Sequence, residues 1–115
     1  MRRVDNGNRT FEQRMQPYYT EAFQILRGRQ KAYGPANIIA AGVWGVVEQA
    51  NNKVERARAQ LFGDILAGKI VLDEMDTETE TVFRDSLIDL MNYAAIALAV
   101  WDGEWTADMK MEGTK

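Results

Sequence analysis

One run of apolar residues constrains this sequence more than any other feature. Of the 15 residues from Leu87 to Trp101, 13 are apolar, and on a helix they would lie all round the axis rather than along one face. Other elements must bury such a segment. With Asp89 and Asn92 inside it, the run is too short and too polar to cross a bilayer. We therefore expect a central helix, from about Glu78 to Asp102, in a protein that is not embedded in a membrane.

The segments before this run have helical spacing, and the sequence contains no strand pattern. Helix formers extend over residues 11–33, and Gly34-Pro35 ends that helix because glycine accepts the left-handed cap and proline cannot continue a helix. A short helix over residues 35–41 and a long one over residues 43–66 follow, separated by glycine. The long helix has a predicted core stripe at steps of three and four residues: Val43, Val47, Ala50, Val54, Ala57, Leu61 and Ile65.

These segments are enough for one domain, because 115 residues can build a single core. We predict an all-α fold, a four- to five-helix bundle over residues 11–102. A flexible arm (1–10) precedes it and a charged flexible tail (103–115) follows it. So small a bundle is expected to bury apolar surface against a copy of itself, as a homodimer or homotetramer. The large side chains available for this contact are Trp44, Phe62, Trp101 and Trp105.

The composition excludes several classes of chemistry. The chain has no cysteine and no histidine, which rules out disulfides, thiolate zinc sites, imidazole ligands and the usual catalytic triads. Any metal must be held by oxygen ligands, which favours Mg²⁺ or Mn²⁺. The net charge of −3 argues against direct nucleic-acid binding, whereas a free nucleotide remains possible with a bound metal. The N-terminal residues lack the apolar stretch of a signal peptide, so we expect a cytoplasmic protein.

Three polar residues share one face of the central helix. Asp85, Asp89 and Asn92 stand at positions i, i+4 and i+7. A buried carboxylate needs a partner, and two carboxylates one turn apart repel each other, which a divalent ion would relieve. The alternative is that the helix dipole favours Asp85 near the start of the helix and that Asp89 pairs with an arginine.

The long helix before it supplies a possible opposite wall. Helical bundles often build metal sites from carboxylates on facing helices, so Glu48 or Glu55 can complete a site with the aspartates. The alternative is that these glutamates belong to a solvated charged face. Lys53 and Arg56, one turn apart, can hold phosphate oxygens or can pair with the aspartates.

The break between the first two helices combines a lysine, an aromatic residue and an amide: Lys31, Tyr33 and Asn37. Such a turn can place an aromatic ring over a base and point backbone N–H groups at an anion. Its alternative is a plain connection between two helices.

Taken in order, these short motifs resemble the nucleotide modification-associated domain 1 family. This family of small proteins, often from phages, is placed in the all-α NTP pyrophosphatase superfamily with MazG and the dimeric dUTPases. The resemblance covers residues 11–102. Its motifs are Lys31…Tyr33-Gly34…Asn37, Gly42-Val43-Trp44-Gly45, Asn52-Lys53-Val54-Glu55-Arg56 and Asp85-Ser86-Leu87-Ile88-Asp89-Leu90-Met91-Asn92-Tyr93.

The resemblance implies an oligomeric helical bundle with a Mg²⁺-dependent site for a nucleoside triphosphate, from which water releases pyrophosphate. In the superfamily, a Glu-x-x-Glu pair and a Glu-x-x-Asp pair hold the metals. Asp89 matches the aspartate of the second pair, and Lys53 and Arg56 match the family's lysine-arginine pair. The chain has no Glu-x-x-Glu, and Asn52 and Ser86 stand where acidic residues are expected.

Three functional hypotheses follow. The first is a Mg²⁺- or Mn²⁺-dependent pyrophosphohydrolase acting on a (deoxy)nucleoside triphosphate, with Asp85 and Asp89 as catalytic and metal-binding residues supported by Glu48 or Glu55. The second is a module that binds or sequesters a nucleotide without cleaving it, in phage DNA modification or counter-defence. The third is a structural helical oligomer. For the first two hypotheses, the expected nucleotide contacts are Lys31, Tyr33, Asn37, Asn52, Lys53, Arg56 and Asn92.

Overall fold

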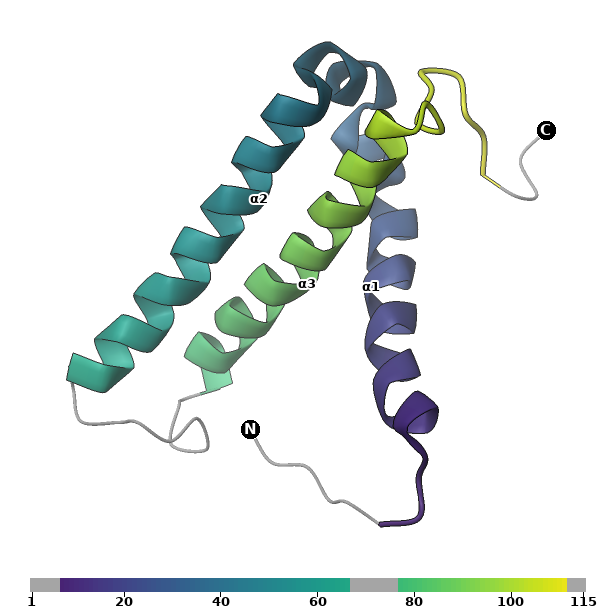
Figure 1. Cartoon of the computed structure of the whole chain (residues 1–115). Coiled ribbons are helices and arrows are strands. Elements are labelled where there is room, and N and C mark those ends of the chain that lie inside the picture. The colour runs from purple at the N-terminus through teal and green to yellow at the C-terminus, as the bar shows by residue number, and fades with distance from the viewer. Residues whose placement is uncertain (1–6, 67–76, 112–115) are drawn as a thin grey trace.

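The computed structural model describes residues 7–66 and 77–111, except for the side chains of residues 31–33, 60–66 and 77. Helices account for most of the described chain, which contains no strand (Figure 1). They are α1 (Phe11–Tyr33), α2 (Pro35–Leu66) and α3 (Thr77–Trp101). The all-α prediction is therefore confirmed. The predicted count of four to five helices is not, because the described residues form three, of which α2 consists of two segments.

The bounds of α1 follow from its sequence. Thr10 and Gln13 form a reciprocal cap, in which each backbone N–H donates to the other side chain, at 3.2 Å to Thr10 Oγ1 and 2.9 Å to Gln13 Oε1. At the other end, Gly34 adopts a φ of 63°, which ends the helix where the Gly-Pro pair predicted. Pro17 lies inside α1 rather than at its start.

Helix α2 is divided at Gly42, as the two glycines of this region led us to expect. Gly42 has a φ of 70° and a ψ of −177°, far from helical values, and the segments on either side are helical. The buried face of the second segment follows the predicted stripe only in part: Ala57 is buried, and Val43, Ala50 and Val54 are half-buried. Val46 and Ala57 are buried and Lys53 is partly buried, whereas Val47, a predicted core residue, is exposed. Leu61 and Ile65 also belong to the predicted stripe, but the structure does not describe their side chains.

Helix α3 begins at Thr77, one residue before the predicted start, and ends at Trp101. Its end has the hydrogen bonds of a Schellman motif: Gly103 N–H donates to Val100 O at 3.2 Å and Glu104 N–H donates to Ala99 O at 2.8 Å. Gly103 takes the left-handed conformation that the motif requires, with a φ of 77°. Thr77 and Glu80 have the spacing of a capping box in the sequence, but the structure does not describe the side chain of Thr77.

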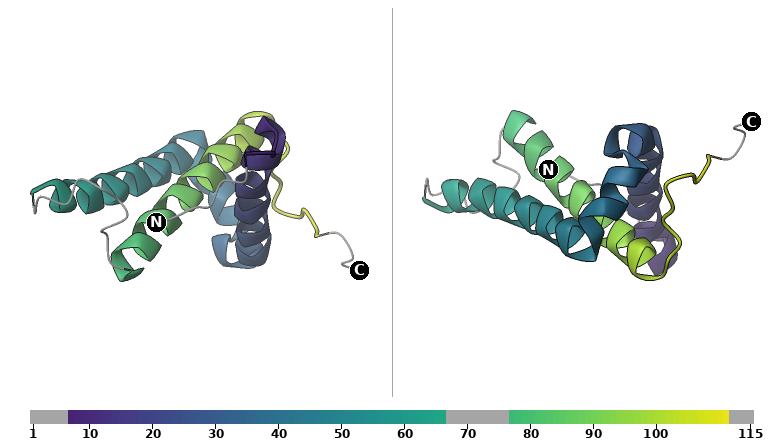
Figure 2. Two further views of the ribbon diagram at one scale, coloured as in Figure 1. Left: turned by 90° about the horizontal axis from the view of Figure 1, so that it is seen from below. Right: turned by 90° about the horizontal axis from the view of Figure 1, so that it is seen from above.

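The three helices meet at one end of the molecule and spread apart toward the other. Helices α1 and α3 both begin at the open end, and α2 runs back toward it (Figure 1). Two further views show α2 and α3 side by side and α1 crossing them (Figure 2). Most of the packing joins α2 to α3, and α1 contacts each of the other helices much less. None of the described helices is long and apolar enough to cross a membrane.

Few apolar residues are buried in the part of the chain that the structure describes. The buried apolar residues of the described chain are Ala22, Val46, Ala57, Ile88 and Ile96. The radius of gyration is 16.8 Å, compared with about 13 Å for a compact domain of 115 residues. Trp44 and Trp101 are among the exposed large side chains, so their indole rings do not contribute to the core.

The segment after α3 turns back toward the break between α1 and α2. Trp105 is partly buried, and its indole N–H donates to Pro35 O at 3.2 Å. Residues 103–111 were assigned to the flexible tail in the sequence analysis. In the structure, this indole ties them to the first residue of α2.

Candidate functional site

The three helices each contribute one charged side chain to a single cluster at Asp89. Arg29 of α1 donates from Nη1 to Asp89 Oδ1 at 2.8 Å, and Lys53 Nζ of α2 lies 3.1 Å from Asp89 Oδ2. The Asp89 side chain is 12% exposed, compared with 20% for Lys53 and 49% for Arg29. We call these three residues the Asp89 cluster. It lies beneath the protein surface and opens to solvent on the Arg29 side.

The Asp89 cluster explains how a carboxylate can be buried on an apolar helix. Burying an ionised carboxylate is costly unless it is paired, and here each oxygen has its own cationic partner. The alternative that Asp89 pairs with an arginine is therefore what the structure shows, with a lysine added. The carboxylate is thus held between a guanidinium and an ammonium group from two different helices.

Tyr93 follows Asp89 by one helical turn and responds to the same charges. Burial raises the pKa of its phenol above the ordinary value of 10.0, and the negative charge of Asp89 raises it further. The guanidinium of Arg29 acts in the opposite direction and lowers it. The phenol therefore stays protonated well above neutral pH and keeps an O–H group next to the cluster.

Asn92 is a buried residue that connects two helices. It was predicted to position a nucleotide, but its side chain is buried and its amide donates from Nδ2 to Ala22 O at 2.9 Å. This hydrogen bond joins α3 to α1 inside the core. Ser86 is also buried, and its hydroxyl donates to Val82 O within α3 at 2.9 Å.

The predicted acidic ligands do not gather around Asp89. Asp85 is exposed, one helical turn before Asp89 in α3. Glu48 and Glu55 are exposed on α2, and Glu55 pairs with Arg58 at 3.5 Å. This arrangement matches the alternative that these glutamates form a solvated face. In the described part of the chain, no group of three or more acidic side chains is placed to hold a metal ion.

Of the expected nucleotide contacts whose side chains the structure describes, Lys53 alone reaches the cluster. Asn52 and Arg56 are exposed on α2. Asn37 is exposed in the first turn of α2, where its backbone N–H donates to Gly34 O at 2.8 Å. Lys31 and Tyr33 belong to the last turn of α1, but the structure does not describe their side chains.

Arg29 is a residue of the site that was not predicted from the sequence. Ala22 of α1 is buried and Ile25 is half-buried, and Arg29 continues their face at i+7 and i+4 from these residues. A cation on a buried helical face requires an anion on a neighbouring helix. The sequence pattern could therefore have indicated Arg29, which lies one turn beyond the last apolar residue of this face.

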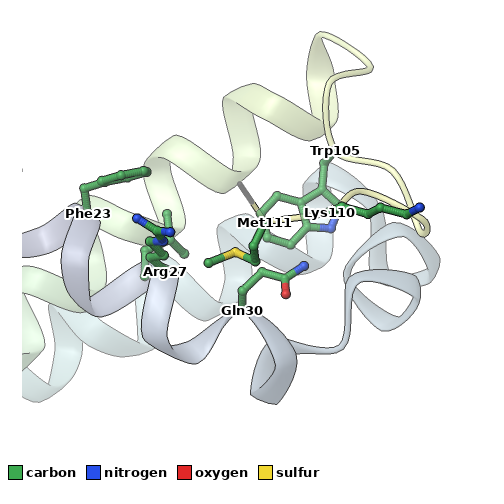
Figure 3. Close-up of a pocket in the computed structure, with 7 residues that line it drawn as sticks. Phe23, Arg27, Gln30, Trp105, Lys110 and Met111 are labelled. Atoms are coloured by element: carbon green, nitrogen blue, oxygen red, sulfur yellow. The ribbon is translucent and has the colours of Figure 1, made fainter. Parts of the chain in front are cut away.

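A separate pocket lies between α1 and the C-terminal segment (Figure 3). It has a volume of about 310 Å³ and combines apolar walls with the side chains of Arg27 and Gln30. Its C-terminal wall consists of Trp105, Lys110 and Met111. None of the residues predicted from the sequence to form a site lines this pocket.

The fold and the site together define a small helical protein with a buried carboxylate held by two cations from neighbouring helices. Compared with known proteins, the chain matches no family model, no curated protein and no solved structure. Its function is therefore inferred from the geometry of the Asp89 cluster and from the motifs of its sequence.

Proposed function

We propose that this protein binds a nucleoside phosphate and that Arg29 and Lys53 of the Asp89 cluster hold the phosphate. One observation carries the proposal: two cations from different helices converge on a single, largely buried carboxylate, and one of them is about half exposed. The preference for a nucleotide over other anions comes from the order of the sequence motifs around Lys53, Asp89 and Tyr93.

The side chains of the cluster suit a phosphate. A guanidinium carries N–H donors in a planar fork and an ammonium carries three N–H donors, and both groups bind phosphate oxygens. Asp89 holds both cations in place before a ligand arrives, so their side chains lose less entropy on binding. Arg29, about half exposed, gives the ligand access from solvent.

A magnesium centre fits these residues poorly. Both oxygens of Asp89 already accept from cations, and a metal ion would have to displace Arg29 or Lys53 to reach them. Asp85 is exposed one turn away and no third carboxylate of the described chain joins it. We therefore derive no hydrolytic step, and we favour the module that binds a nucleotide without cleaving it over the Mg²⁺-dependent pyrophosphohydrolase.

A panel of NTPs and dNTPs, with and without Mg²⁺ or Mn²⁺, tests this proposal. We expect saturable binding in calorimetry without added metal and no release of pyrophosphate with it. The Asp89→Asn variant distinguishes a protein that only binds the nucleotide from a pyrophosphohydrolase, because the substitution keeps the shape of the side chain and removes its charge. Its Kd for the nucleotide should be no weaker than that of the wild type, since the cluster then carries a larger positive charge.

A pyrophosphohydrolase would behave differently in the same assay. It would release pyrophosphate from at least one nucleotide in the presence of metal and lose that activity in Asp89→Asn. Loss of nucleotide binding in a folded Asp89→Asn variant would also overturn the proposal. The absence of binding for every nucleotide would leave the structural oligomer as the better description.

A further inference from the structure

Helix α1 presents a row of large apolar side chains that its own chain leaves uncovered. Phe11, Met15, Tyr19 and Phe23 follow each other at every fourth residue and are 74%, 38%, 59% and 58% exposed. Residues at this spacing form a continuous ridge along one side of a helix. We call these four residues the α1 ridge.

A groove runs beside the α1 ridge. It lies between α1 and α3 and has a volume of about 570 Å³. Seven of its ten lining residues are apolar or aromatic: Met15, Tyr18 and Tyr19 from α1, and Phe83, Leu87, Ile88 and Met91 from α3. Phe83, Leu87 and Met91 are again four residues apart, so a second ridge forms the opposite wall. An ion pair between Arg84 and Glu21 bridges the two helices at this groove.

We propose that this groove receives helix α1 of a second copy of the chain. The ridge and the groove share Met15 and Tyr19, so one surface supplies both the inserted side chains and the wall that accepts them. Such a surface is self-complementary, as a two-fold symmetric interface requires. Packing of every-fourth-residue ridges between one another is the commonest way in which helices pack in globular proteins.

The exposed area also agrees with a second copy. An aromatic side chain offers 150–250 Å², so the α1 ridge and Leu87 together leave roughly 400–500 Å² of apolar surface open. That is about half of the ~800 Å² per partner in a standard interface. Pairing two copies would place α1 and α3 of each chain in a four-helix arrangement. It would also enlarge a core that now buries five apolar residues of the described chain.

Sedimentation equilibrium at micromolar concentration tests this interface. We expect the wild type to have a mass at least twice the 13.1 kDa of one chain. Tyr19→Glu should at least halve that mass, because a carboxylate at the centre of the ridge would be buried without a partner. Gln24→Glu is the matched control: it adds the same charge to an exposed position of α1 that does not line the groove, and it should leave the mass unchanged.

A wild-type mass of 13.1 kDa, or equal masses for the wild type and a folded Tyr19→Glu variant, would overturn the proposal. Circular dichroism establishes whether the variant keeps its helices. These outcomes do not depend on nucleotide binding, so this inference and the proposed function can fail separately.

Covalent linking covers the case in which Tyr19→Glu does not fold. The chain has no cysteine, so a single introduced thiol reports on one position. A short bis-maleimide should link Tyr19→Cys chains into dimers in high yield and leave Gln24→Cys largely monomeric. Equal yields from the two variants would contradict the proposed interface.

Discussion

Tyr93 is the residue whose ionisation reports most directly on the Asp89 cluster. Burial and the charge of Asp89 raise its pKa, although Arg29 opposes them. Because the pKa of this phenol is higher in the folded state than in the unfolded state, its protonation stabilises the folded protein. This stabilisation is fully present at pH values below the unfolded pKa of about 10. This stabilisation is lost as the pH rises through the pKa of the folded state.

We therefore predict that the ultraviolet absorbance titration of the folded protein contains a phenol that ionises above pH 10.0. Tyr93→Phe should remove this component and leave the rest of the titration unchanged. Arg29→Gln should move the component to still higher pH, because the neighbouring positive charge is lost. A Tyr93 that titrates at or below pH 10.0 would show that the phenol is neither buried nor close to Asp89.

At the scale of single residues, the sequence predicted the central carboxylate but not its full set of partners. Asp89 could be singled out because a charge inside an apolar helix needs compensation, and Lys53 was among the cations considered. Arg29 was missed because it lies 60 residues away in sequence and only the crossing of α1 over α3 brings it near. Asn92 was assigned to a ligand, but its amide serves a backbone carbonyl of α1. Amide side chains suit either role, and a sequence alone does not distinguish them.

At the scale of elements, the helices follow from local signals in the sequence. Gly34 ends α1, Gly42 divides α2 and the apolar run forms most of α3, as predicted. The direction in which a helix turns its buried face was harder to predict. Val46 is buried and Val47 exposed because the position of α3 decides which side of α2 is covered, and two valines in succession carry no information about that side.

Gly42 provides the test at this scale. Its φ of 70° with a ψ of −177° belongs to a region that essentially only glycine adopts. We predict that Gly42→Ala lowers the free energy of unfolding by about 1–3 kcal/mol in urea denaturation followed by circular dichroism.

Gly28→Ala is the control for this change. Gly28 lies inside α1, and a Cβ atom added there would meet no other atom within 4 Å. Alanine should therefore stabilise the helix by about 0.5–1 kcal/mol. If Gly42→Ala were also stabilising, α2 would be one continuous helix and the division at Gly42 would be wrong.

At the scale of the whole molecule, the Asp89 cluster exists only when all three helices are assembled. Arg29, Lys53 and Asp89 come from α1, α2 and α3, and the weakly packed α1 is joined to α3 by polar contacts of Arg29, Asn92 and Arg84. This arrangement could not be predicted from the sequence, because helical periodicity gives the faces of helices but not the order or angles in which they cross. For the same reason, the sequence did not predict that so few described residues are buried or that a groove lies open between α1 and α3.

The most direct test of a phosphate site at the Asp89 cluster is the Kd of a nucleoside triphosphate for the wild type, Lys53→Met and Arg58→Met, measured by calorimetry at low salt. Lys53→Met keeps an unbranched side chain that is one atom shorter and removes a charged hydrogen bond of about 1.5–3 kcal/mol, so binding should weaken about tenfold or more. Arg58 is an exposed cation of the same helix that pairs with Glu55 outside the cluster, and Arg58→Met should stay within about twofold of the wild type. Equal Kd values for the two folded variants would contradict a phosphate site at the cluster.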